Sequence, residues 1–150
     1  MQLPNGQHDA LAYLATVEDA LARVASLDAE LGGLLSTTRK LSASGYADVL
    51  PDDCHPYMLV ADAARRRADA VRAAVELVGD CTERLDALGG DYARLLRLRH
   101  VDGKSWYEVA DALSYSVRQC HRLHEQALAA FADYLPTELQ APVQKALSGS

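Results

Sequence analysis

Gly103–Leu128, with the sequence GKSWYEVADALSYSVRQCHRLHEQAL, is the stretch that decides the fold. Its apolar residues recur at helical spacing after Ser105, and serine is a residue type that caps helix N-termini well. Ser114-Tyr115-Ser116 then interrupts the pattern, and Ser116 can cap a second helix. Two short helices joined by so few residues must cross steeply, so the stretch predicts a helix-turn-helix.

The side chains of this stretch divide into an inward and an outward set. Ala110 has almost no side chain at the position where the second helix would approach most closely. The residues predicted to fill the wedge between the helices are Val109, Leu113, Tyr115, Cys120 and Leu123. Those left outward on the second helix are Val117, Arg118, His121, Arg122 and Glu125. The outward set is polar and partly cationic, which suits a groove of DNA.

The composition predicts an all-α protein of one domain, or of one small domain with an appendage. The chain has 150 residues, with only 9 Gly and 5 Pro and no β-branched runs. Its net charge of -6 argues against a protein that coats nucleic acid without selectivity. The charge is uneven, because residues 1–91 carry 8 basic against 15 acidic side chains and residues 92–135 carry 6 against 5. This distribution permits DNA binding by the C-terminal part.

Cysteine usage and hydropathy predict a cytoplasmic protein. The 3 cysteines are odd in number and far apart, which fits reduced thiols better than a disulfide framework. The opening MQLPNGQHDA has neither a basic region nor an apolar core, so it does not resemble a signal peptide. No apolar run approaches the roughly 18 residues that a membrane-spanning helix needs.

Two long segments with heptad-like spacing precede the deciding stretch. From about His8 to Leu35 the apolar row comprises Ala10, Leu14, Val17, Leu21, Val24, Leu31 and Leu35, with Asp28 on the row. From about Tyr57 to Leu88 a row with 4-3 spacing comprises Tyr57, Ala61, Ala64, Ala68, Val71, Val75, Val78, Thr82 and Leu85. Rows this narrow pack against other helices, so they predict an antiparallel, coiled-coil-like hairpin that could also form a homodimer.

The chain therefore divides into three predicted parts. Residues 1–90 form the helical hairpin, with a linker at about 36–56 where Ser, Thr, Gly and Pro accumulate. Residues 91–135 form the helix-turn-helix domain, which begins with a helix over 91–100 and a stop at Gly103. In that helix we expect the leucines to face inward and Arg94, Arg97 and Arg99 to face outward. Residues 136–150 form a tail.

Arg65-Arg66-Arg67 on the second long helix can be interpreted in two ways. The cluster could be an additional phosphate-binding patch, or it could be a solvated face opposite Asp62 and Asp69. The second interpretation is favoured, because helix faces with charges of both signs are usually only exposed to solvent.

No catalytic, metal or cofactor site is predicted. Gly103-Lys104-Ser105 resembles the end of a phosphate-binding loop, but Leu98 stands where that motif needs a glycine, and the preceding segment is helical. Cys54-His55 offers two adjacent donors and no second pair. His121 and His124 are two ligands at most, because Cys120 is expected to point inward. The spacing supports no nucleophile or paired-carboxylate arrangement, so we expect no enzyme.

The run LLRLRHVDGKSWYEVADALSYSVRQCHRLHEQALAAF resembles region four of bacterial sigma factors. More closely, it is similar to phage and prophage transcriptional regulators of the ArpU/RinA type, which share that module. The similarity covers roughly Tyr92 to Leu135. The residues in register are Gly103, Trp106, Glu108, Ala110, Leu113, Tyr115, Arg118, Gln119, Arg122, Leu123 and His124. Ser114 departs from the pattern, because glycine is usual at that turn position.

The resemblance implies sequence-specific binding of double-stranded DNA in the major groove and regulation of phage transcription. It makes Lys104, Ser105, Trp106, Ser116, Val117, Arg118, His121 and Arg122 the candidate DNA-binding residues. The helix N-termini among them could hold phosphates. Host RNA polymerase could be a further partner at the promoter.

Two alternatives remain open at the level of sequence. One is a DNA-packaging protein similar to a small terminase, which would form a ring. The other is a helical protein-interaction module that binds no DNA. The sequence does not determine which operator sequence would be bound, whether the protein would activate or repress transcription, or which genes it would regulate.

Overall fold

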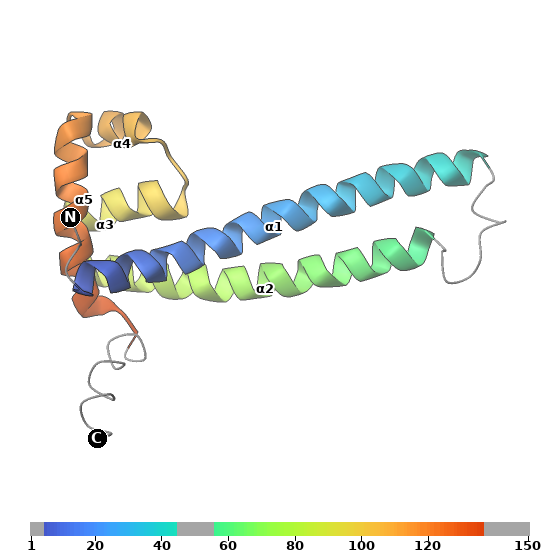
Figure 1. The fold of residues 1–150 in the computed structure, drawn as a ribbon, viewed down its shortest axis with the longest axis horizontal. Helices are drawn as coiled ribbons and strands as arrows, with labels where there is room; N and C mark the ends of the chain where they lie inside the picture. Colours follow the sequence, from blue (N-terminus) through green and yellow to red (C-terminus); the bar gives the residue numbers. More distant parts are fainter. Residues whose placement is uncertain (1–4, 45–55, 137–150) are drawn as a thin grey trace, which may run out of the picture. The chain divides into compact units, whose positions relative to one another are not determined.

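A computed structural model describes residues 5–44 and 56–136, and in these ranges every regular element is helical, which confirms the all-α prediction. The elements are α1 (Asn5–Ser44), α2 (Pro56–Leu88), α3 (Gly90–Leu96), the π-helical turn η3 (Arg97–Val101), α4 (Trp106–Leu113), α5 (Val117–Phe131) and the 3-10 turn η4 (Ala132–Tyr134) (Figure 1). Within the same ranges, no helix combines the length and the apolar character needed to cross a membrane.

The chain forms two compact units whose boundaries differ from the predicted parts. The long-helix unit is Asp19–Glu76, and the short-helix unit combines Met1–Glu18 with Leu77–Ser150. The predicted boundary near residue 90 therefore does not separate the units. The beginning of α1 and the end of α2 belong with the C-terminal helices because they share their core.

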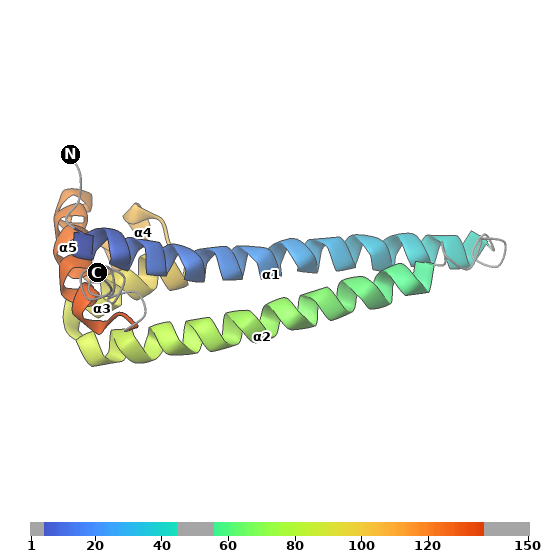
Figure 2. The ribbon, with the colours of Figure 1, turned by 60° about the horizontal axis from the view of Figure 1, so that its bottom comes forward.

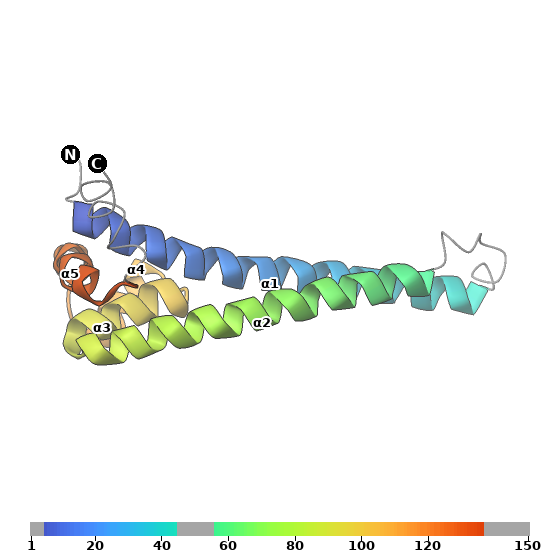
Figure 3. The ribbon, with the colours of Figure 1, turned by 90° about the horizontal axis from the view of Figure 1, so that it is seen from below.

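In the long-helix unit, α1 and α2 lie side by side and run in opposite directions (Figures 2 and 3). Ion pairs join them, with Arg66 Nη2 2.8 Å from Glu30 Oε1 and Arg67 bound to Asp28. Asp28, the charged residue on the predicted apolar row, is thus neutralised by a residue of α2. Arg65 pairs with Asp62 at 2.5 Å. All three arginines of the cluster contact carboxylates. Arg65 fits the solvated-face interpretation, whereas Arg66 and Arg67 are half-buried and bind carboxylates of α1.

The linker predicted at about 36–56 is wrong over residues 36–44, because α1 continues through Ser44. Gly32 and Gly33 lie inside the helix, although each glycine costs about 1 kcal/mol relative to alanine. Packing outweighs this local preference, since Thr38 is only 8% exposed. Residues 45–55, including Cys54 and His55, lie outside the described part of the chain.

The apolar row predicted to be buried on α2 is wrong for most of its length, because the residues that are buried mostly stand one position before the predicted ones. The buried residues of α2 are Ala63, Ala70, Ala74, Cys81 and Leu85, whereas Val75 is 66% exposed and Tyr57 56% exposed. Only Leu85 is shared by the predicted and the buried rows. The α2 sequence carries two adjacent apolar rows with the same spacing, and periodicity cannot tell which of them contacts α1.

The core of the short-helix unit brings together all its helices. Its fully buried side chains include Phe131, Leu14, Leu85, Leu95, Leu96, Leu128, Val17, Val109, Cys81 and Cys120. The rings of Tyr13 and Phe131 lie 6.0 Å apart between centroids, and the Tyr13 hydroxyl donates to Asp80. Arg84 Nη1 donates to the Tyr134 carbonyl oxygen at 2.7 Å. These contacts hold α1, α2 and the end of α5 around one core.

Candidate nucleic-acid interface

Both predicted capping serines cap their helices, each in a reciprocal capping box. Ser105 Oγ accepts from the Glu108 backbone N–H at 3.2 Å, and Glu108 Oε1 accepts from the Ser105 N–H at 3.2 Å. Ser116 and Gln119 repeat the arrangement at 3.1 and 2.9 Å. Hydrogen bonds from the Ser105 backbone and side chain lower the pKa of Glu108. Local sequence alone positions the starts of α4 and α5.

The turn between α4 and α5 needs a left-handed residue, as expected at the position where the related pattern has glycine. Ser114 adopts φ 60° and ψ 37°, and the Tyr115 N–H donates to the Ala110 carbonyl at 3.1 Å. Tyr115 was predicted to fill the wedge, and this is wrong because its side chain is 38% exposed. Its hydroxyl instead donates to Asp91 at 2.8 Å, which ties the turn to the start of α3.

The inner face of α5 is apolar, as predicted from the spacing. Cys120, Ala127, Leu128 and Phe131 are buried, and Val109, Ala110 and Leu113 of α4 are buried with them. Burial raises the pKa of the Cys120 thiol, which is therefore a neutral packing group. Leu123 is only half-buried, so it lies at the edge of this core.

Arg118 and Arg122 are exposed on α5 and form neither an ion pair nor a hydrogen bond with any residue that the structure describes. The arginines of the preceding elements differ, because they support the fold. Arg94 Nη2 donates to the Ala112 carbonyl at 3.0 Å, and Arg97 pairs with Asp86 at 3.4 Å. Arg94 is exposed, as predicted, whereas Arg97 and Arg99, which were also expected to face outward, are half-buried.

Trp106 is the centre of an aromatic cluster on the α4 side of α5. Its ring centroid lies 4.3 Å from that of His121 and 5.1 Å from that of His124, and the Arg99 guanidinium lies 4.8 Å above it. Trp106 is half-buried, so it supports α5 through these rings. His121 is exposed but is held against Trp106.

The remaining predicted residues lie at the two helix starts. Lys104 is exposed, with Nζ 3.8 Å from Glu108 Oε2, and its carbonyl accepts from Arg99 Nη1 at 2.9 Å. Val117, at the start of α5, is half-buried. The eight predicted residues thus fall on α4, α5 and the segments before them, with Arg118 and Arg122 the most available for a ligand.

A chain of polar groups, exposed at Glu18 and buried at His100, connects α1 to α5, and the sequence offered no indication of it. Glu18 contacts Nδ1 of His100, which is 7% exposed, and His100 Nε2 lies 2.9 Å from His124 Nε2. Burial lowers the pKa of His100, and the opposing effect of Glu18 is smaller. Burial, followed by the charges of His100 and Arg99, lowers the pKa of His124 to about 4. Both imidazoles are therefore neutral near pH 7.

The hydrogen bonds determine the tautomers of this neutral pair. Because the Glu18 carboxylate can only accept, His100 must donate through Nδ1–H and present Nε2 as an acceptor. His124 then donates through Nε2–H. Two nitrogen donors do not make a metal site, and in the described ranges no group of three potential ligands is close enough to hold a metal ion.

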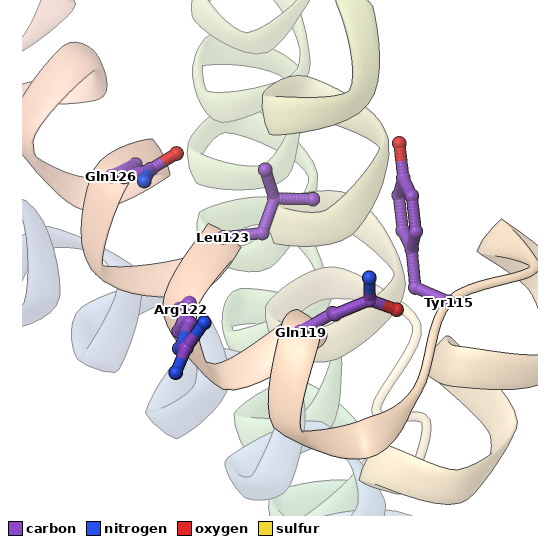
Figure 4. A pocket seen from close by; sticks show the side chains of 5 residues that line it. All are labelled: Tyr115, Gln119, Arg122, Leu123 and Gln126. Atoms are coloured by element: carbon purple, nitrogen blue, oxygen red, sulfur yellow. The ribbon is translucent and has the colours of Figure 1, made fainter.

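A shallow hollow of about 220 Å³ lies beside α5, lined by Tyr115, Gln119, Arg122, Leu123 and Gln126 (Figure 4). Gln119 and Leu123 extend toward the side of Tyr115, whereas Arg122 points in a different direction. Gln126 Oε1 accepts from the Tyr92 hydroxyl at 3.2 Å. Sequence reasoning missed Gln119 and Gln126 as surface residues of this helix, although their seven-residue separation places them on one side.

Comparisons with protein-family models, with curated proteins and with solved structures gave no match.

Proposed function

We propose that this protein is a sequence-specific DNA-binding transcriptional regulator that inserts α5 into the major groove. The observation that carries the proposal is that the side chains of Arg118 and Arg122 are available to a ligand. Both are exposed and unpaired within the described residues, on a capped helix that follows a short helix and a three-residue turn. This is the arrangement in which a helix-turn-helix presents its recognition helix.

The roles of the side chains follow from their positions. Arg118 and Arg122 would contact base edges or the adjacent phosphates, since arginine binds both in a bidentate way. Val117, half-buried at the start of α5, would offer a methyl surface to thymine. Lys104, Ser105 and Ser116 would contact phosphates near the helix starts. Trp106 would keep His121 oriented.

The proposal extends to the setting in which such a regulator acts. It is a binding protein without catalytic activity, encoded by a phage or prophage and working in the bacterial cytoplasm, with host RNA polymerase as a possible second partner. A homodimer through the long helices would present two copies of α5 to two half-sites. The packaging protein and the protein-interaction module stay as alternatives that the same experiment separates.

Selection of bound sequences from a random duplex pool, followed by mobility-shift titration at several salt concentrations, tests the proposal. We expect a defined motif, and we expect Arg118→Ala and Arg122→Ala each to weaken binding by about 1–3 kcal/mol. Arg72→Ala is the matched control, because Arg72 is 74% exposed but lies on α2. The affinity should also fall linearly with salt on logarithmic axes.

Three outcomes would contradict the proposal. No binding to any duplex at low salt would favour the protein-interaction module. Binding without a motif, by a large ring-shaped particle, would favour packaging. Equal binding by both α5 variants and by wild type would show that α5 is not the recognition element.

A further inference from the structure

Four exposed side chains follow one side of α5 and are called here the α5 stripe: Arg118, His121, Arg122 and Glu125. They stand at positions i, i+3, i+4 and i+7, which lie above one another on a helix. This is the spacing at which a recognition helix lying along the major groove contacts base edges. Glu125 is the only acid among the four, so it would meet DNA with different chemistry from its neighbours.

The carboxylate of Glu125 is available to a ligand. Within the described ranges it forms no hydrogen bond and no ion pair. Gln7 of α1 donates to the backbone carbonyl of Glu125 at 2.7 Å, which leaves the side chain free. Arg122 precedes Glu125 on the helix without pairing with it, because a basic residue that comes before an acidic one pairs less favourably than in the reverse order.

A free carboxylate can recognise only certain bases, since it accepts hydrogen bonds and donates none. In the major groove, guanine and thymine present acceptors to it, and adenine places the N7 acceptor beside its N6 amino group. Cytosine presents the N4 amino group without a neighbouring acceptor. Cytosine is therefore the base that suits the side chain of Glu125 best.

The position of Glu125 on α5 determines how far its base lies from those of the arginines. Each residue advances along the helix axis by about 1.5 Å, so Glu125 lies about 4.5 Å beyond Arg122 and about 10 Å beyond Arg118. Successive base pairs of a duplex are about 3.4 Å apart. With α5 lying along the groove, Glu125 meets a base pair about three steps from that of Arg118.

We propose that Glu125 is a specificity-determining residue, which accepts a hydrogen bond from the N4 amino group of a cytosine in the major groove. The inference rests on the proposed function and deepens it, because it names the base that one side chain recognises. Arginine pairs best with guanine. The bound duplex therefore carries a cytosine about three base pairs from the guanine that Arg118 contacts.

The negative charge of Glu125 has a second effect, which differs from recognition of the base. Phosphates repel a carboxylate, so Glu125 weakens binding to every duplex while it favours the one with cytosine at its position. Loss of the side chain should therefore strengthen binding to unrelated duplexes and remove the preference at one base pair. Glutamine in its place should change the preference, because its amide binds N6 and N7 of adenine.

Selection from a random duplex pool, carried out in parallel for wild type, Glu125→Ala and Glu125→Gln, tests the inference. The wild-type motif should contain a cytosine that Glu125→Ala no longer selects, and Glu125→Gln should select adenine there. In mobility-shift titrations, replacing that cytosine should weaken wild-type binding by about tenfold or more and Glu125→Ala binding by less than about twofold. Asp111→Ala is the matched control, because it removes an exposed carboxylate from α4 and should leave the motif unchanged.

Both Glu125 variants should keep the wild-type helical content by circular dichroism, because the side chain is exposed. The same motif in wild type and in both variants would overturn the inference, and the proposed function would stand. Tighter binding of Glu125→Ala to every duplex without a change of motif would also overturn it, because the carboxylate would then only repel phosphates. A wild type that selects no motif would contradict the proposed function and the inference together.

Discussion

Mild acidification should destabilise the short-helix unit through the His100–His124 pair. In the neutral pair, one Nε2 donates and the other accepts across 2.9 Å. A proton added to His100 would place two N–H groups between the rings and remove this bond. The groups around the pair are Glu18 from α1, Arg99 from η3, Trp106 from α4 and His121 from α5. Only Glu18 favours the charged form.

The size of the effect follows from the pKa of His124, which is about 4 in the folded protein against 6.5 for the ordinary side chain. A lowered histidine pKa means that the unfolded chain binds the proton more readily. The contribution of neutral His124 to the free energy of unfolding is therefore present above pH 6.5 and is lost as the pH falls toward 4. Between pH 7 and pH 5 the loss is about 2 kcal/mol, and partial exposure of the imidazole reduces this to about 1 kcal/mol.

Urea titrations at pH 7 and pH 5, followed by the fluorescence of the single tryptophan, Trp106, would measure the loss. Acidic groups also titrate in this range, so the informative quantity is the difference between wild type and His124→Gln. Glutamine keeps a donor for His100 but does not titrate, and the variant should lose about 1 kcal/mol less than wild type on acidification. His8→Gln changes an exposed histidine of α1 and should behave as wild type.

An equal pH dependence in wild type and His124→Gln would refute this reasoning. It would mean that the pKa of His124 is not lowered in the folded protein, so that His124 gains no additional proton on unfolding. A loss in His8→Gln as small as that in His124→Gln would lead to the same conclusion, because the difference would then not be specific to His124.

Two further predictions concern single side chains of the short-helix unit. Ser114→Gly should raise the free energy of unfolding by about 1 kcal/mol, because glycine adopts the left-handed φ of 60° without strain, and a decrease in thermal denaturation experiments would contradict this. Tyr13→Phe keeps the ring against Phe131 but removes the hydroxyl that donates to Asp80, so it should cost about 2 kcal/mol in urea titrations. An unchanged stability would mean that this hydrogen bond contributes nothing.

Predictions from the sequence were accurate where the relevant interactions are local. Ser105 and Ser116 cap α4 and α5 through residues three positions further along, so a four-residue pattern contains the whole interaction. Gly103 has a positive φ of 69°, as its place after a helix predicts. Cys120 is buried because helical spacing within α5 separates its inner from its outer face.

Predictions were inaccurate where two patterns were equally good or the partner was distant. Val75 and Ala74 belong to adjacent rows of the same period, and only contact with α1 shows that Ala74 is the buried one. Tyr115 fits an inward position by spacing, but a hydroxyl bond to Asp91 draws it outward.

The sequence by itself determined the helical class, the starts of α4 and α5 and the exposure of Arg118 and Arg122, because each depends on neighbours within one or two helical turns. Only the tertiary structure decided that Arg94 and Arg97 support the fold, and that Glu18, His100 and His124 form one chain. The physical reason is distance along the chain. Glu18 and His100 are 82 residues apart, and no periodicity in either segment encodes which buried polar group will satisfy the other.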